Sequence, residues 1–238
     1  MSTPCSVPAT DTGHARAQEQ SGFFGNLPPQ SVAELNQIKH SSVFPAGALL
    51  FIESQTPRGV YLIRSGRVKL TTTSRAGKTL ILHIAQPGEI LGMPSAVSGR
   101  PYELTAEALE PCRLEFVRRE DFLRFLRSNP EACLHAALQL GQDCHHTYEL
   151  IRALGLSHSV SEKLARLLLD WAAAGEEGKH GIRIKLALTH QEIAQLIGTS
   201  RETVTRVLGE FREKKLAWVQ GSTLWIADRH GLQRMIGE

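Results

Sequence analysis

The sequence predicts an α+β protein with a β-rich part of jelly-roll type, a long helix and a C-terminal winged helix-turn-helix. Three observations favour this fold class. Short strands punctuated by glycine fill about 43–117, where turns recur at a spacing typical of a sandwich, barrel or jelly roll. An apolar seam with alternating spacings of four and three runs through 131–156, as in a coiled-coil helix. Two short helices joined at a glycine follow within 189–209.

The length and composition are those of a globular protein. The chain has 238 residues, enough for two domains, with 42% hydrophobic and 21% charged residues. It contains no apolar run near the roughly 18 residues that a membrane helix needs. The first residues lack the apolar core of a secretion signal. We therefore expect a cytoplasmic protein with a flexible N-terminal tail at 1–21.

The distribution of charge points to the C-terminal third. The net charge is +3, and residues 1–150 hold 14 basic and 14 acidic side chains. Residues 151–238 hold 13 basic and 10 acidic side chains, so the whole positive excess lies there. This asymmetry favours a polyanionic partner for that part of the chain.

The β-rich domain is expected to span 22–130. Its strands alternate apolar and polar residues, the period of a half-buried strand. The pattern predicts, in order, a strand at 60–66, a strand at 67–73, a turn at 74–77, a strand at 79–84 and a turn at 86–89.

A change to helical periodicity follows residue 118. It predicts a helix at 120–126, a break at Asn129-Pro130 and a long helix with a hinge over 131–158. The seam of the long helix comprises Cys133, Ala137, Leu140, Cys144, Thr147, Ile151 and Leu154. Such a seam favours a homodimeric coiled coil. The alternative is a helix that packs only on its own domain.

The C-terminal domain is expected to span 159–238. The sequence predicts a helix at 160–174, a polar loop at 175–181 and a short strand at 181–186. A hairpin at 217–226 turns around Gly221-Ser222 and would form a wing behind the helix-turn-helix.

Paired capping boxes define the helix-turn-helix. Thr189 with Glu192 would start the first helix, and Thr199 with Glu202 would start the second. Gly198 suits a left-handed turn between the two helices. The buried positions would be Ile193, Leu196 and Ile197 in the first helix, with Val204, Leu208 and Phe211 in the second.

The opposite face of the second helix predicts contacts with double-stranded DNA. This face exposes Arg201, Glu202, Thr205 and Arg206. Arginine can bind guanine O6 and N7 together, and glutamate can accept a hydrogen bond from cytosine. Candidate backbone contacts complete the DNA-binding set, namely Ser200, Thr203, Thr189 and Gln191. The alternative is a helical hairpin whose arginines and glutamate only pair in solvent.

With these motifs the chain resembles the bacterial CRP/FNR family of catabolite-activator-type regulators over about 22–230. The resemblance rests on the run 200–206 and on Gly66, Gly77, Gly88 and Gly92. It implies a cyclic-nucleotide-binding jelly roll, a dimerisation helix and a winged helix, with DNA-bound dimers that contact RNA polymerase. The family's base-reading positions fall on Arg201, Glu202 and Arg206, which implies a palindrome with TGTGA-like half-sites.

The effector site departs from the pattern that the resemblance implies. After Gly92, Met93 replaces the glutamate that holds the ribose in cyclic-AMP binders. Tyr102 and Glu103 stand near the position of an Arg-Ser or Arg-Thr pair that holds the cyclic phosphate, and Arg100 lies close by. Thr147 matches the adenine-sensing position. These departures argue against cyclic AMP, and we expect no fixed cofactor.

Several means of control remain open. The protein could respond to another ligand such as cyclic di-GMP, act constitutively, or sense redox state through Cys133 and Cys144 on the seam. Haem ligation by His83 or Cys112, and a metal or pH role for His145-His146, are weaker alternatives, since these residues suit core or solvated positions. No catalytic triad, metal-ligand spacing or phosphate loop is evident, so we do not expect an enzyme.

Overall fold

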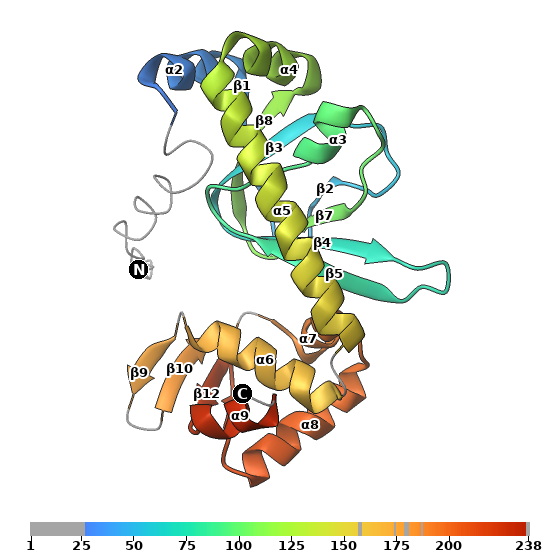
Figure 1. Ribbon diagram of the computed structural model, residues 1–238, viewed down its shortest axis with the longest axis vertical. Helices are drawn as coiled ribbons and strands as arrows, with labels where there is room; N and C mark the ends of the chain where they lie inside the picture. Colours follow the sequence, from blue (N-terminus) through green and yellow to red (C-terminus); the bar gives the residue numbers. More distant parts are fainter. Residues whose placement is uncertain (1–26, 157–158, 174, 179–180, 187, 237–238) are drawn as a thin grey trace, which may run out of the picture. The chain divides into compact units, whose positions relative to one another are not determined.

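The computed structural model describes residues 27–156, 159–173, 175–178, 181–186 and 188–236. They form two units (Figure 1). The first contains the described residues of Met1–Thr72 and His83–Cys144, and the second those of Thr73–Leu82 and His145–Glu238. The tail predicted at 1–21 lies outside the described residues.

The β-rich part is built from two antiparallel sheets of four strands. One has the order β1-β8-β3-β6 and the other β2-β7-β4-β5. The strands are β1 (Lys39–Phe44), β2 (Leu49–Phe51), β3 (Gly59–Ser65), β4 (Val68–Thr73), β5 (Thr79–Ala85), β6 (Ile90–Leu91), β7 (Thr105–Ala108) and β8 (Cys112–Arg118). The prediction of a β-rich N-terminal domain in an α+β protein is confirmed.

Strand β8 separates two hydrophobic cores. Cys112 and Leu114 belong to a core that draws residues from both sheets. Val117 belongs to a second core that draws on helices. The two sets differ because successive side chains of a strand point to opposite faces. Glu115, on the face of Val117, is buried and forms ion pairs of 2.8 Å with both Lys39 and Arg64 on the neighbouring strands.

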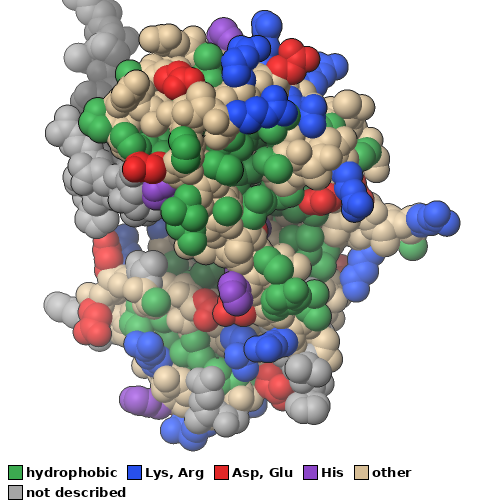
Figure 2. Space-filling model, turned by 45° about the horizontal axis from the view of Figure 1, so that its top comes forward, with side chains coloured by type: hydrophobic (Ala, Val, Ile, Leu, Met, Phe, Trp, Pro, Cys, Tyr) green, Lys and Arg blue, Asp and Glu red, His purple; other side chains and the backbone are tan. Residues whose placement is uncertain are grey.

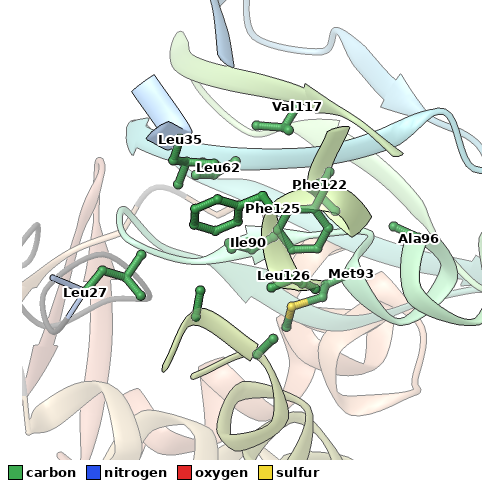
Figure 3. Packing of buried hydrophobic residues seen from close by; sticks show 13 residues of the cluster. Leu27, Leu35, Leu62, Ile90, Met93, Ala96, Val117, Phe122, Phe125 and Leu126 are labelled. Carbon is green, nitrogen blue, oxygen red and sulfur yellow. The ribbon is translucent and has the colours of Figure 1, made fainter. Parts of the chain in front are cut away.

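The second core joins the β1-β8-β3-β6 sheet to four helices (Figure 3). The helices are α2 (Pro29–Ile38), α3 (Met93–Ser98), α4 (Arg119–Ser128) and the first turns of α5 (Pro130–Leu156). Phe122 and Phe125 of α4 are almost fully buried between these elements. Burial of a side chain of this size contributes about 1.5–3 kcal/mol, so α4 is a main anchor of the helical layer.

Asn129 links three of these helices just before Pro130. Its Oδ1 accepts a hydrogen bond from the Ser31 hydroxyl at 2.7 Å, and its Nδ2 donates to the Phe125 carbonyl at 3.0 Å and to Glu34 at 2.8 Å. The predicted break is therefore a turn in which α4 ends and α5 starts at Pro130.

Helix α5 has one face in its own domain and one in solvent. Ala132 and Ala136 are buried in the second core, and Leu140 packs against it. The exposed face carries what we call the α5 stripe, the large hydrophobic residues Leu134, Leu138, Tyr148 and Ile151, which are 56–62% exposed. Of the predicted seam, Leu140 faces the domain interior, whereas Cys133, Ala137, Cys144, Thr147 and Ile151 are exposed, and Ile151 belongs to both the seam and the stripe. Figure 2 shows hydrophobic side chains exposed among charged ones on one face of the molecule.

The described residues of the second unit include the end of α5, four further helices and a four-stranded sheet of order β11-β12-β10-β9. Its further elements are α6 (Val160–Ala172), β9 (Glu176–Gly178), β10 (Gly181–Lys185), α7 (His190–Ile197), α8 (Arg201–Glu213), β11 (Ala217–Gln220), β12 (Thr223–Ile226) and α9 (Arg229–Met235). Ser159 starts α6, and its hydroxyl accepts a hydrogen bond from the Glu162 N–H. Strands β11 and β12 form the predicted wing hairpin, which β10 and β9 extend.

Two elements differ from the sequence interpretation. The predicted polar loop contains β9, whose Glu176 and Glu177 pair with Arg183 and Ile182 of β10. A three-residue exposed strand shows no alternation that a sequence pattern could reveal. Helix α3 was also not predicted, because its six residues are too few to establish a helical period.

Candidate functional site

The first helix of the helix-turn-helix, α7, begins with the predicted capping box. The Thr189 hydroxyl accepts a hydrogen bond from the Glu192 N–H at 3.2 Å, and a Glu192 carboxylate oxygen accepts from the Thr189 N–H at 2.9 Å. Both groups thus satisfy N–H donors that the first turn leaves unpaired. Thr189 and Gln191 remain exposed at this end of the helix.

The turn after α7 depends on glycine. Gly198 has φ 70° and ψ 33°, the left-handed conformation, and its N–H donates to the Ala194 carbonyl. The Thr199 N–H donates to the same carbonyl at 2.9 Å. This arrangement ends α7 and turns the chain toward α8 within two residues.

The second helix, α8, starts one residue later than predicted. Ser200, rather than Thr199, is the N-cap, and its hydroxyl accepts from the Thr203 N–H at 3.2 Å. Thr199 is already used in closing α7, which leaves Ser200 in the extended conformation that a cap requires. The Ser200 and Thr203 hydroxyl oxygens lie 3.0 Å apart, so both belong to the cap.

The capping geometry also acts on Glu202. Its own backbone N–H and the Ser200 hydroxyl stabilise the carboxylate and lower the pKa of Glu202. Glu202 therefore stays ionised at neutral pH, and an ionised carboxylate only accepts hydrogen bonds. That chemistry suits an amino group such as the one on cytosine.

Helix α8 separates its buried and exposed sides sharply. Its buried residues are Val204, Val207, Leu208 and Phe211. The predicted base-contacting residues Arg201, Glu202, Thr205 and Arg206 are all exposed. Arg206 forms an ion pair with Glu210, one turn further along the helix. The fold therefore places two arginines and a glutamate together in the first two turns of an exposed helix.

A further residue, His190, was not part of the predicted site. As the first residue of α7, it places its Nδ1 3.0 Å from the hydroxyl oxygen of Thr205 on α8. The hydroxyl of Thr205 also donates to the Arg201 carbonyl at 3.0 Å. Only the position of His190 directly after the N-cap, next to the crossing helix, could have suggested this contact from the sequence.

In the β-rich domain, Met93 is part of the second hydrophobic core. It is the first residue of α3 and has no exposed surface. The preceding Gly92 has φ 75°, and a Cβ at that position would lie 2.8 Å from the Tyr102 ring. Gly92 is therefore required both for the turn into α3 and for the close approach of Tyr102.

Tyr102 is packed as an interior residue. Its ring stacks on Phe51 with a centroid distance of 4.0 Å, and its hydroxyl donates to the Gly59 carbonyl at 2.8 Å. The Gly59 N–H approaches the same hydroxyl at 3.4 Å. Only 3% of Tyr102 is exposed, so the side chain fills the space beside Gly92.

The remaining predicted effector residues are Arg100, Glu103 and Thr147. Arg100 and Glu103 are exposed on the chain that flanks Tyr102. Thr147 is exposed on α5 and belongs to the second unit.

Of the candidate histidines and cysteines, His83 and Cys112 form hydrogen bonds within the protein, and Cys133 and Cys144 are exposed. His83 Nε2 lies 2.6 Å from a Glu89 carboxylate oxygen. Buried Cys112 donates from its thiol to the backbone carbonyls of Arg67 and Glu110, whereas Cys133 and Cys144 are exposed free thiols. Within the described ranges, no cluster of three or more His, Cys, Asp or Glu side chains could hold a metal ion. Among the helices described, none combines the length and apolar character of a membrane span.

Family models match both the N-terminal and the C-terminal part of the chain. The cyclic nucleotide-binding domain model matches residues 42–129, and the Crp-like helix-turn-helix domain model matches residues 162–235. The global nitrogen regulator of Nostoc sp. is 30% identical over 175 residues, which cover 73% of this chain and 78% of the relative. A CRP-like cAMP-activated global transcriptional regulator of Mycobacterium tuberculosis is 27% identical over 216 residues, covering 90% and 96%.

Solved structures share the fold. The c-di-GMP responsive global regulator CLP of Xanthomonas campestris aligns with a TM-score of 0.74 at 20% identity, covering 84% of this chain and 99% of that one. A mutant of CooA from Carboxydothermus hydrogenoformans aligns with a TM-score of 0.72 at 22% identity, covering 85% and 89%. With a cyclic nucleotide-binding domain, a DNA-binding helix-turn-helix and these relatives, the chain belongs to the CRP/FNR family of transcription regulators.

Proposed function

We propose that the protein is a homodimeric regulator that reads a TGTGA-like palindrome through Arg201, Glu202 and Arg206. The observation that carries the proposal is their joint exposure in the first two turns of α8, whose other side is buried. In helix-turn-helix proteins this end of the second helix enters the major groove. There the arginines would bind guanine and the glutamate would accept from cytosine.

Backbone contacts would come from the start of each helix. Thr189 and Gln191 are exposed at the start of α7, and Ser200 and Thr203 cap α8. Helix N-termini attract phosphate because their N–H groups carry partial positive charge. These contacts would fix the register of the protein on DNA, while the side chains on α8 select the sequence.

The α5 stripe supports the dimer. Four large exposed hydrophobic side chains on a 27-residue helix are costly to leave in water. A second copy of the same helix would cover them along a two-fold axis. Two recognition helices would then enter successive major grooves about 34 Å apart, and the bound dimer would contact RNA polymerase in the cytoplasm.

We further propose that cyclic AMP is not the effector of the cyclic nucleotide-binding domain. Met93 is buried in the core and cannot hold a ribose hydroxyl, and Tyr102 occupies the space beside Gly92. Glu103 would repel the phosphate of a nucleotide bound nearby. We therefore propose that DNA binding does not require cyclic AMP, although the Mycobacterium tuberculosis relative is named as cAMP-activated.

Fluorescence anisotropy with a labelled TGTGA palindrome tests the proposal. We expect Arg206→Ala to lose about 1–3 kcal/mol of binding per half-site and to relax the preference for guanine at one position, because its bidentate contact is gone. The matched control is Arg212→Ala, an exposed arginine in the last turn of the same helix.

The same titration tests the effector. Cyclic AMP, cyclic GMP and cyclic di-GMP are each added to the unliganded protein, and we expect unchanged affinity with cyclic AMP. Equal binding of the palindrome and a scrambled duplex would refute the DNA-reading proposal. Tighter binding only with cyclic AMP would refute the proposal about the sensor domain.

A further inference from the structure

The surroundings of Thr205 engage the proton and one lone pair of its hydroxyl within the protein. The oxygen lies 3.0 Å from the carbonyl of Arg201 and 3.0 Å from Nδ1 of His190. A carbonyl only accepts hydrogen bonds, so the single hydroxyl proton of Thr205 goes to Arg201. His190 must then donate its Nδ1 proton to the hydroxyl oxygen.

This arrangement sets the orientation of Thr205. Threonine in a helix divides between two side-chain conformations because its oxygen can bond back to the preceding turn. The hydrogen bond to the Arg201 carbonyl selects the conformation in which the Thr205 oxygen faces the preceding turn. The N–H of His190, on a different helix, donates to the same oxygen from a second direction. With its proton engaged, the hydroxyl has no hydrogen left to donate, and the apolar group that exposed Thr205 can offer is its methyl.

The position of Thr205 makes that methyl relevant to DNA. Thr205 is exposed and stands directly before Arg206 and one turn after Arg201. A threonine methyl in the major groove can contact the 5-methyl group of thymine, which is the apolar feature of that groove. A phosphate contact is disfavoured, because the hydroxyl that would make it is already bonded.

We propose that Thr205 is a specificity-determining residue that reads the 5-methyl group of a thymine, and that His190 is the positioning residue that fixes its orientation. The proposal rests on the DNA-binding function proposed above. It adds an apolar contact to the polar ones made by Arg201, Glu202 and Arg206.

Deoxyuridine substitution isolates the contact, since deoxyuridine differs from thymidine only by the missing methyl. Each thymine of the half-site, on either strand, is replaced in turn in a duplex, and affinity is measured by anisotropy. The wild-type protein should lose about fourfold in affinity per half-site at one thymine and little at the others, the factor expected for one buried methyl group.

Variants of Thr205 separate its methyl from its hydroxyl. Thr205→Ser keeps the hydroxyl and should bind thymine and deoxyuridine equally. Thr205→Val keeps a methyl in one strongly preferred conformation and should retain the discrimination. Discrimination that persists in Thr205→Ser would overturn the proposal.

Variants of His190 test the positioning role. His190→Ala should reduce the ratio of the two affinities, and His190→Asn, which offers an N–H donor near the position of Nδ1, should restore it. Circular dichroism melting of each variant identifies loss of folding, which would weaken both duplexes equally. A ratio that His190→Ala leaves unchanged would refute the role of His190.

The two proposals fail in different ways. Binding that does not distinguish the palindrome from a scrambled duplex would refute the proposed function. Specific binding with equal affinity for thymine and deoxyuridine at every position would refute only the methyl contact.

Discussion

Two carboxylates act on His83 of β5. Glu89 lies 2.6 Å from its Nε2, and Asp143 of α5 adds favourable charge. Burial lowers the pKa of His83, but the hydrogen bond and charge of Glu89, with Asp143, outweigh it, and the net pKa is raised. A histidine with a raised pKa stabilises the fold fully below its unfolded pKa of about 6.5, and this stability is lost as pH rises through the folded pKa.

His83→Gln should therefore cost more stability in acid than in base. We expect the free energy of unfolding to fall by about 1 kcal/mol at pH 6, since the pair is charged but partly exposed, and by less at pH 9. Urea unfolding at both pH values measures the difference, with the exposed His40→Gln as the control. An equal cost at the two pH values would exclude a charged pair.

Single positions also show what sequence patterns can and cannot fix. Thr189 and Gly198 could be assigned from the sequence because caps and left-handed turns depend on local chemistry. The shift of the second cap to Ser200 could not, since it depends on how tightly α7 closes. The contact of His190 with Thr205 depends on the crossing of two helices, which no local pattern contains.

Among the elements, α5 differs most on its two sides. Ala132, Ala136 and Leu140 face the domain core, while the α5 stripe faces solvent. An a/d pattern identifies apolar positions but not which of them the helix needs for its own domain. The predicted seam therefore included the core-facing Leu140 together with exposed residues such as Cys133 and Ile151.

Charges introduced on the α5 stripe should dissociate the proposed dimer. Leu134→Glu with Tyr148→Glu would place like charges against their counterparts in the partner, so we expect monomers at micromolar concentration with little loss of domain stability. Sedimentation velocity measures the change, and Gln142→Glu, an exposed position on the flank of α5, is the control. A dimer that persists in the double variant would place the interface elsewhere.

Strand elements were predicted unevenly for a physical reason. β4 and β5 are long enough to show alternation and are joined by a turn with Gly77 in the left-handed conformation. β9 is only three residues long, and it forms a strand because it pairs with β10. Long amphipathic elements can be read from the sequence, whereas short ones are defined by their neighbours.

Across the whole molecule, the positive charge is concentrated in the part that binds DNA. The excess of basic residues lies in 151–238, which contains the helix-turn-helix. Each phosphate neutralised by the protein releases condensed counterions, so affinity depends on salt.

We expect log K for DNA to fall linearly with log salt concentration. For a dimer with on the order of 6–10 phosphate contacts the slope would be about −5 to −9. Anisotropy titrations between low and physiological salt measure it, with a random duplex beside the palindrome. Both should weaken steeply, and salt-independent binding of either duplex would contradict a phosphate-based interface.

The ion pair between Arg206 and Glu210 has a consequence for how the protein searches DNA. In the proposed DNA-reading function, Glu210 would occupy the Arg206 guanidinium in the free protein, and an incorrect base pair would leave that pair intact. Guanine presents two acceptors that match the arginine fork and can displace it. If Arg206 reads guanine as proposed, this exchange would cost little, because an exposed i,i+4 ion pair contributes only about 0.3–0.5 kcal/mol.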